Sequence, residues 1–464
     1  MSSTLKVFSP FDGSLIKELE LQDANQVEKA IVTAKNLFDD RSKWIPKYER
    51  IEILERVVKI MESRVEELTK IAAEEGGKPY VDSKVEVLRA INGVKLAIEN
   101  IGQLGGTEIP MGHTKSSANR MAFTMCEPIG VVVSVSAFNH PLNLTIHQTI
   151  PALAVGCPVI IKPASTTPLS CLNFVEILKE AGLPEGWCQA IVCGRNEAEK
   201  LVTDSRIGFF SFIGSGGVGW RLKSKLANGV HSALEHGGVA PVIVEPDAKI
   251  DEMLPLLAKG GFYHAGQVCV SVQRVFAHES ICDEVANRLS KLAKNLKVGD
   301  PLSPETEVGP LITKGEVDRV EKWVNEAKEN GGRILCGGNR ISDFCFEPTV
   351  ILNPPQNVEI SQKEVFGPVV CVYSYKDRNE AIKLANSLPY SFQASVFTTN
   401  LDTAFDTLQK LKAAAVMVND HTAFRVDWMP FGGREDSGIG VGGIPFSMEE
   451  MTAKKLMVFK SSVL

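Results

Sequence analysis

Residues 208–219 read GFFSFIGSGGVG, an almost unbroken apolar run that passes directly into a glycine-rich segment. A short run of aromatic and β-branched residues without polar alternation is typical of a strand buried on both faces of a parallel sheet. Gly214 to Gly219 fit the pattern G-x-G-x-x-G, which after such a strand predicts a tight turn that opens a helix. The N–H groups at the start of that helix could hold a pyrophosphate. When this pattern occurs without other evidence, a tight turn that binds no ligand is roughly as common.

Similar strand-like runs occupy residues 130–138 and 158–162. They alternate with segments of helical spacing at 143–155, 168–181 and 218–228. Strands and helices in alternation are typical of a doubly wound α/β sheet, the usual architecture of nucleotide-binding domains. The first part of the chain is therefore predicted to bind a nucleotide.

Two further series flank this region. Helical spacing predicts helices at residues 24–38, 48–75 and 82–100. A second α/β series follows the first, with strand-like runs at 241–245, 273–277, 368–373, 394–399 and 414–419. Because no flexible linker separates the two series, we expect two tightly packed domains with a cleft between them.

Composition excludes several classes of protein. The chain has 464 residues, 44% of them apolar, and a formal charge of −6 without any basic stretch, so neither nucleic acid nor a membrane surface is an expected partner. The N-terminus lacks a signal-peptide pattern, and no apolar run reaches the roughly 18 residues of a membrane span. Ten scattered cysteines without metal spacing predict reduced thiols, no metal site and a cytoplasmic enzyme.

Two residues stand out as chemical candidates. Glu235 lies about 20 positions after the glycine-rich turn, where it could clasp a ribose or act as a base. Cys269 lies in AGQVCVS (residues 265–271), where small neighbours would let a substrate approach the thiol. A cysteine in isolation is more often a small buried hydrophobic residue.

Seven motifs in order resemble those of the aldehyde dehydrogenase superfamily and span nearly the whole chain. They are SAFNHPL (136–142), IKPA (161–164), FIGS (212–215), LEHGG (234–238), GQVC (266–269), EVFGP (364–368) and PFGG (430–433) with Ser437-Gly438. The resemblance is to the non-acylating, NAD(P)-dependent members, and the pattern is most similar to the lactaldehyde, glyceraldehyde-type and phosphonoacetaldehyde branches.

The resemblance implies an α/β fold with a Rossmann-like cofactor domain, an α/β catalytic domain and a small β extension for oligomerisation. The implied bounds are 1–107 and 124–236 for the cofactor domain, 237–436 for the catalytic domain, and 108–123 with 437–464 for the extension. A homodimer or homotetramer is expected, with residues 120–126 and 457–464 forming strands between subunits.

The resemblance also assigns roles. Cys269 would attack the aldehyde, Asn139 and the Cys269 N–H would hold the oxyanion, and Glu235 would activate the water that hydrolyses the thioester. The cofactor, NAD or NADP, would be held by Lys162, Ser165, Gly214, Ser215, Gly219, Glu364 and Phe366. Ser165 stands where many NAD-preferring members carry a glutamate, so NADP should be accepted, and His236 replaces a usual leucine.

For the substrate, His147 and Arg425 point to a small polar aldehyde. A succinate-semialdehyde-type or broad-specificity dehydrogenase is the alternative within the family. Outside it, the alternatives are a thiol hydrolase that uses Cys269 with His264 as base, and a non-catalytic binding protein that kept the fold.

Overall fold

A six-stranded sheet forms the centre of the first half of the molecule. The computed structural model describes residues 4–464. The strand order is β19-β9-β8-β5-β6-β7, and every neighbouring pair is parallel except β19 with β9. The strands are β5 (Val131–Val135), β6 (Val159–Lys162), β7 (Cys188–Ala190), β8 (Ile207–Ile213), β9 (His231–Glu235) and β19 (Gly438–Ile439).

Helices cover both faces of this sheet. Val132 belongs to one apolar core, whereas Val131 and Val133 belong to the other, because successive side chains of a strand point to opposite faces. The first core includes side chains of α2 (Lys47–Ser63), α3 (Val65–Gly76), α4 (Tyr80–Ile101), α5 (Pro141–Val155), α6 (Leu169–Glu180) and α15 (Ile444–Glu450). The second includes those of α1 (Ala24–Asp39), α7 (Arg195–Thr203) and α8 (Gly216–Lys223). The predicted doubly wound sheet is thus confirmed.

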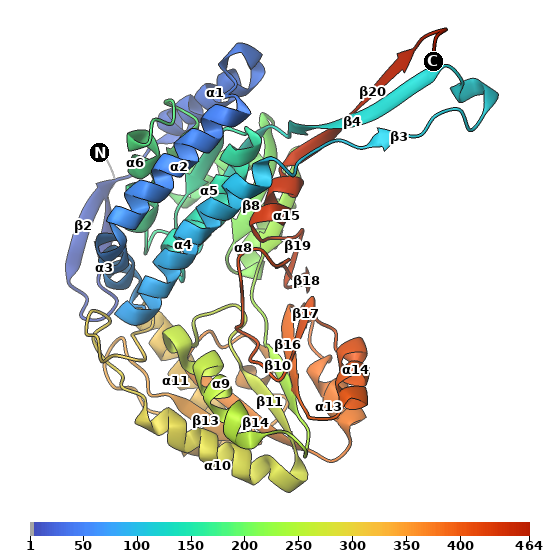
Figure 1. Cartoon of the computed structure of the whole chain (residues 1–464). Coiled ribbons are helices and arrows are strands. Elements are labelled where there is room, and N and C mark those ends of the chain that lie inside the picture. Colours follow the sequence, from blue (N-terminus) through green and yellow to red (C-terminus); the bar gives the residue numbers. More distant parts are fainter. Residues whose placement is uncertain (1–3) are drawn as a thin grey trace.

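The second half contains a seven-stranded sheet, seen below the first in Figure 1. Its order is β12-β13-β14-β11-β10-β16-β17, with only β12 antiparallel to its neighbour. The strands are β10 (Pro241–Val244), β11 (Arg274–His278), β12 (Arg333–Cys336), β13 (Thr349–Leu352), β14 (Val369–Tyr375), β16 (Gln393–Phe397) and β17 (Ala415–Val418). The accompanying helices are α9 (Ile250–Phe262), α10 (Glu279–Asn295), α11 (Lys314–Glu329), α12 (Glu359–Gln362), α13 (Arg378–Ala385) and α14 (Leu401–Lys410).

Some elements differ from the sequence-based expectation. The single helix expected at 48–75 is two helices, because Arg64 between α2 and α3 leaves the helical region with φ −119° and ψ 21°. The hairpin of β1 (Thr4–Phe8) and β2 (Leu15–Glu20) was not predicted, and neither were β12 and β13. Both strands of the hairpin are largely exposed, so they lack the apolar run that identifies buried strands. The remaining short elements are β15 (Tyr390–Ser391), β18 (Arg434–Glu435), η1 (Arg41–Lys43), η2 (Lys115–Ser117) and η3 (Tyr263–Gly266).

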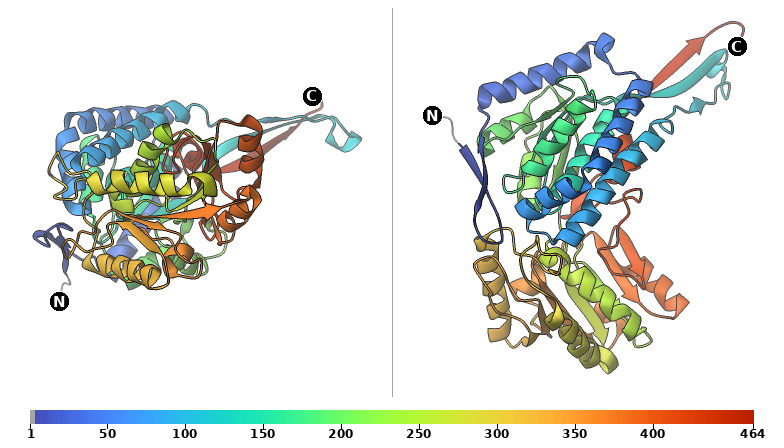
Figure 2. Two further views of the ribbon diagram at one scale, coloured as in Figure 1. Left: turned by 90° about the horizontal axis from the view of Figure 1, so that it is seen from below. Right: turned by 60° about the vertical axis from the view of Figure 1, so that its left-hand side comes forward.

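A three-stranded ribbon projects from the body of the molecule (Figures 1 and 2). It consists of β3 (Glu108–Ile109), β4 (Arg120–Pro128) and β20 (Thr452–Lys460), and β4 pairs with β20 along its full length. Leu456 and Val458 in β20 are 55% and 49% exposed. An isolated ribbon with exposed apolar side chains suits an interface, and its use between subunits stays a prediction. No helix within residues 4–464 is long and apolar enough to cross a membrane.

Candidate active site

A cavity of about 530 Å³ lies where the two sheets face each other. From the first half it receives Asn139, which follows β5, and Glu235, the last residue of β9. From the second half it receives Cys269, which follows η3. The three residues predicted to carry the chemistry therefore line a single cavity, although they lie far apart in the sequence.

The turn that presents Cys269 has an unusual backbone. His264, Ala265 and Gly266 all adopt positive φ angles of 48°, 54° and 70°. Gly266 also permits a close approach, because a Cβ there would collide with the carbonyl oxygen of Gly367. The Cys269 turn is thus packed directly against the segment that carries Glu364 and Phe366, where only glycine fits.

Burial makes the Cys269 thiol a weak acid. It raises the pKa of Cys269 to about 12, and the positive charge of Arg425 opposes this shift. The thiol is therefore protonated at neutral pH in this state, so its attack on a carbonyl needs a base. The Cys269 N–H has no hydrogen-bond acceptor within residues 4–464, which leaves this donor free for an oxyanion.

Asn139 is held in place from two sides. Its Nδ2 donates a hydrogen bond of 3.0 Å to the carbonyl of Gln267, which leaves the second amide hydrogen available. Lys78 Nζ donates to the carbonyl of Asn139 at 3.0 Å and also pairs with the buried carboxylate of Glu86. Glu86 in turn accepts two backbone N–H groups at the start of α5. This buried network orients the Asn139 turn, and no local pattern marks Lys78 or Glu86 as part of it.

Glu235 is half-buried, and its carboxylate has no hydrogen bond in the described part of the chain. Burial raises the pKa of Glu235, and the charge of Arg425 opposes the rise. The carboxylate lies over Gly442, where a Cβ would collide with its Oε1. A carboxylate with a raised pKa suits a general base better than a ribose clasp.

The predicted pyrophosphate turn lines the same cavity. Gly214 and Ser215 line it, and Ser215 caps α8 without using its side chain for the cap. A Cβ at Gly217 would meet nothing within 4 Å, so the helix start is open. Free N–H groups at an open helix N-terminus are suited to a phosphate, and α8 therefore fits a dinucleotide.

Gly219 has a different role from the one its motif implies. It does not line the cavity, and a Cβ there would collide with the imidazole of His236. His236 is 3% exposed, its Nδ1 lies 2.8 Å from the carbonyl of Gly214, and burial lowers its pKa. A neutral ring that donates from Nδ1 ties β9 to the glycine-rich turn. In this chain the third glycine makes room for a neighbouring side chain.

Glu364 and Phe366 also line the cavity. Burial raises the pKa of Glu364 to about 8, and among residues 4–464 the only hydrogen bond to its carboxylate comes from Gly238 N–H at 3.3 Å. Phe366 has a positive φ of 45° and packs edge-to-face against Phe138, with ring centroids 5.8 Å apart. Both side chains thus line the same cavity as Cys269, and their contact with the nicotinamide end of a cofactor stays a prediction.

Lys162 and Ser165 lie beside the cavity rather than on its wall. Lys162 Nζ donates to the carbonyl of Pro163 at 2.9 Å, and Ser165 is exposed. Only Ala164 from this segment lines the cavity. To bind a ribose as predicted, Lys162 would therefore have to exchange its hydrogen bond to the Pro163 carbonyl for one to the ribose.

Arg425 lines the cavity together with Cys269 and Glu235. Its guanidinium lies 3.6 Å from the ring centroid of Phe431, and its Nη2 is 3.4 Å from Nδ1 of His147. Within residues 4–464 it forms no ion pair, and Asp427 pairs with Arg89 and His147 instead. The cavity thus carries a positive charge that no carboxylate neutralises directly.

His147 lies behind Arg425 rather than on the cavity wall. It is 5% exposed, its Nε2 lies 2.8 Å from Asp427 Oδ1, and burial lowers its pKa to about 4. This position does not support the predicted direct contact between His147 and the substrate. Its contacts instead connect Asp427 with Arg425.

Arg89 of α4 is a residue that sequence reasoning missed. It lines the cavity and forms a forked hydrogen bond to Asp427, with Nε and Nη2 at 3.1 and 2.7 Å from the two carboxylate oxygens. The two residues are 338 positions apart, and Arg89 lies on an ordinary amphipathic helix. No local pattern could distinguish it from a solvated arginine.

The geometry gives no support to a thiol hydrolase. His264 is completely buried, neither of its ring nitrogens has a partner among residues 4–464, and it does not line the cavity. Burial holds its pKa well below the usual range. The Cys269 thiol therefore has no hydrogen-bonded imidazole of the kind that such an enzyme needs.

Comparisons with known proteins agree with this geometry. Residues 1–457 match the model of the aldehyde dehydrogenase family. The chain is 36% identical over 455 residues to 3-sulfolactaldehyde dehydrogenase of Priestia aryabhattai, covering 98% of this chain and 94% of that protein.

Solved structures give the same result. Aldehyde dehydrogenase 21 of Physcomitrella patens, in complex with the reaction product succinate, is 36% identical with a TM-score of 0.96, over 99% of this chain and 96% of that one. The glyceraldehyde-3-phosphate dehydrogenase GapN of Methanocaldococcus jannaschii, complexed with NADP, is 33% identical with a TM-score of 0.94, over 99% and 100%. The expected fold is confirmed, and the chain belongs to the aldehyde dehydrogenase family, whose members are oxidoreductases that act on aldehydes.

Proposed function

We propose that this chain oxidises a short aldehyde bearing an anionic group to the corresponding carboxylic acid, with NADP or NAD as the hydride acceptor. The observation that carries the proposal is the position of Arg425. Its guanidinium lines the same cavity as Cys269 and Glu235 and has no carboxylate partner within the described chain. A carboxylate, sulfonate or phosphate on the substrate would supply that partner.

The first step joins the Cys269 sulfur to the aldehyde carbon. The thiol must first lose its proton to water in the cavity, because burial keeps the thiol protonated at neutral pH. The carbonyl oxygen becomes an oxyanion in the resulting thiohemiacetal. The free N–H of Cys269 and the second amide hydrogen of Asn139 are the donors available to it.

The cofactor is a dinucleotide whose nicotinamide, when bound, accepts hydride from the carbon that Cys269 holds. The open helix start at Gly214 and Ser215 suits its phosphates, and Glu364 and Phe366 are the side chains available to its nicotinamide end. Ser165 provides no carboxylate to repel a 2′-phosphate. The relative GapN was crystallised with NADP, which supports the same choice for this chain.

Hydrolysis completes the reaction. Loss of hydride leaves a thioester on Cys269, and Glu235 takes a proton from the water that attacks the thioester carbon. The C–S bond breaks, the carboxylic acid leaves, and the Cys269 sulfur departs as a thiolate that can attack the next aldehyde. Because acyl transfer to a thiol cofactor would not need this base, the presence of Glu235 favours hydrolysis.

The names of three relatives support the substrate class. They refer to a sulfonated aldehyde, to succinate as a product and to a phosphorylated aldehyde, and each of these molecules carries an anionic group apart from the reacting carbon. Succinate semialdehyde is included in the proposed class, whereas a broad-specificity enzyme would oxidise neutral aldehydes equally well.

The test is an assay of reduced cofactor across a panel of aldehydes, each with NAD and with NADP. The panel pairs short aldehydes that carry a carboxylate, sulfonate or phosphate with neutral ones of equal length. We expect kcat/KM to be highest for the anionic members. Equal values for charged and neutral aldehydes would refute the substrate class and leave the dehydrogenase activity standing, whereas no signal at all would refute the activity.

A further inference from the structure

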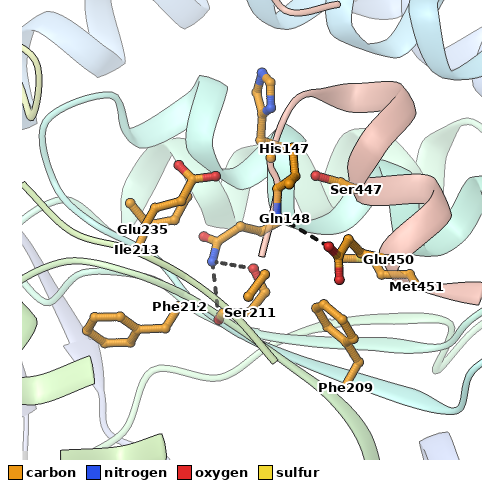
Figure 3. Close-up of a pocket in the computed structure, with 13 residues that line it drawn as sticks. His147, Gln148, Phe209, Ser211, Phe212, Ile213, Glu235, Ser447, Glu450 and Met451 are labelled. Carbon is orange, nitrogen blue, oxygen red and sulfur yellow. Dashed lines mark hydrogen bonds between the residues drawn. The ribbon is translucent and has the colours of Figure 1, made fainter. Parts of the chain in front are cut away.

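A second, much smaller cavity lies beside Glu235 (Figure 3). Its volume is about 20 Å³, which is enough for a water molecule. In Figure 3, Glu235 and Glu450 lie at opposite ends of the group of lining side chains, with Gln148 between them. The cavity therefore connects the proposed base to a second carboxylate that the mechanism above does not use.

Gln148 supplies an unused acceptor to this cavity. Its Nε2 donates to the carbonyl of Val135 at 3.1 Å and to Oγ of Ser211 at 3.1 Å, which fixes the orientation of the amide. The residue is only 1% exposed, and its buried Oε1 has no hydrogen-bond partner among residues 4–464. Because buried polar atoms are normally paired, this oxygen indicates a water in the cavity.

Two features of the C-terminal segment create the cavity. Gly442 leaves the space that Glu235 enters, since a Cβ at this position would collide with Glu235 Oε1. Glu450, the last residue of α15, accepts the N–H of Val441 through Oε1 at 3.3 Å and is half-buried. Its second oxygen has no hydrogen bond within the described chain and can exchange protons with solvent.

We propose that the water in this cavity and Glu450 carry the proton from Glu235 to solvent in each turnover. The proposal rests on the function proposed above, in which Glu235 receives protons and the overall reaction releases one. Glu235 donates its proton to the cavity water, which passes a proton to the Glu450 carboxylate. Glu450 then releases a proton to bulk water, and no electrons move in these steps. Gln148 Oε1 holds the water between the two carboxylates.

The test separates hydrolysis from hydride transfer. A p-nitrophenyl ester acylates Cys269 without cofactor, so a burst of nitrophenolate counts working thiols and the slower steady phase reports hydrolysis of the thioester. Glu450→Gln keeps an oxygen for the Val441 N–H but cannot carry a proton. Glu449→Gln, an exposed neighbour, is the matched control.

We expect Glu450→Gln to keep a full burst while its steady rate falls at least tenfold in dilute buffer. High concentrations of a small buffer acid should restore that rate, because exogenous proton carriers replace the lost group. Glu449→Gln should match the wild type. A wild-type steady rate for Glu450→Gln in dilute buffer, or a reduced rate that buffer does not restore, would overturn the proposal. Absence of a burst in the wild type would instead count against Cys269 as the nucleophile and thus against the proposed function.

Discussion

His147 Nε2 lies 2.8 Å from Asp427 Oδ1, and both side chains are at least 95% buried. The pKa of Asp427 stays well below its usual range, because the hydrogen bond from His147 and the charge of Arg89 outweigh the effect of burial. His147 is neutral, since burial lowers its pKa to about 4. It therefore donates from Nε2 to Asp427 and presents Nδ1 as an acceptor to Arg425, 3.4 Å away. This chain of contacts holds the Arg425 guanidinium in the cavity.

Replacing Arg425 by alanine tests the anion site. We expect kcat/KM for an anionic short aldehyde to fall roughly 10-fold to 150-fold, equivalent to the loss of a charge-assisted hydrogen bond of about 1.5–3 kcal/mol. The value for propanal should change little. Arg434→Ala removes an exposed arginine of the same charge and is the control. An equal loss on both aldehydes would leave Arg425 with a structural role only.

The neutral state of His147 predicts how stability depends on pH. Its pKa is about 4 in the folded chain and about 6.5 when unfolded, so the unfolded chain binds more protons between these values. This contribution to stability is present above about pH 6.5 and is lost as the pH falls towards 4, by up to about 1.4 kcal/mol per pH unit.

The measurement is the urea midpoint at intervals from pH 7.5 to 4.5. His147→Gln, which keeps an amide donor and an acceptor but does not titrate, should lose less stability over this range than the wild type. Identical curves for the two proteins would mean that His147 is not held neutral by its surroundings.

The contact between Gly219 and His236 predicts a coupled pair of substitutions. An alanine in a helix is normally more stable than a glycine by about 1 kcal/mol. Gly219→Ala should nevertheless lower the thermal midpoint, because its Cβ would collide with the His236 ring. In the background of His236→Ala the same substitution should lower the midpoint less, because only the contact with the Phe212 ring, 2.9 Å from the Cβ position, remains. Additive effects of the two substitutions would contradict the packing described.

Elements that are marked by a run of neighbouring residues could be predicted from the sequence. The buried runs before Gly214 and around Val133 gave β8 and β5, and motif order placed Cys269, Glu235 and Asn139 in one cavity. Each motif is a few residues long and fixes its own backbone, so its placement follows once the fold is known.

Residues that act through distant partners could not be predicted in this way. Arg89 meets Asp427 across 338 positions, and His147 stands behind the cavity because Asp427 holds it there. Gly219 satisfies the dinucleotide pattern, yet its lack of a side chain makes room for the His236 ring. Sequence reasoning identifies which residue types are available, whereas tertiary packing decides which of them face the cavity.

Cofactor choice gives a further prediction. Because Ser165 carries no negative charge, both NADP and NAD should serve as the oxidant. Their kcat/KM values should differ by less than about a hundredfold, which corresponds to roughly 2.7 kcal/mol. Ser165→Glu should reduce kcat/KM for NADP more than for NAD, because its carboxylate would repel the 2′-phosphate. If NAD were preferred by more than a hundredfold in the wild type, groups other than residue 165 would set the choice.

The central claim is that Cys269 carries the acyl group and that water activated by Glu235 removes it. Glu235→Gln should keep a burst of reduced cofactor while steady turnover falls, because it slows hydrolysis and not hydride transfer. Cys269→Ser should bind cofactor but give no burst.

The most direct measurement is the peptide mass of the Glu235→Gln protein, quenched in acid after mixing with an anionic aldehyde and NADP. The peptide that contains Cys269 should gain the mass of the acyl group, in proportion to the cofactor reduced in the burst. A burst of reduced cofactor with Cys269 unmodified, or with the acyl group on another residue, would contradict the account.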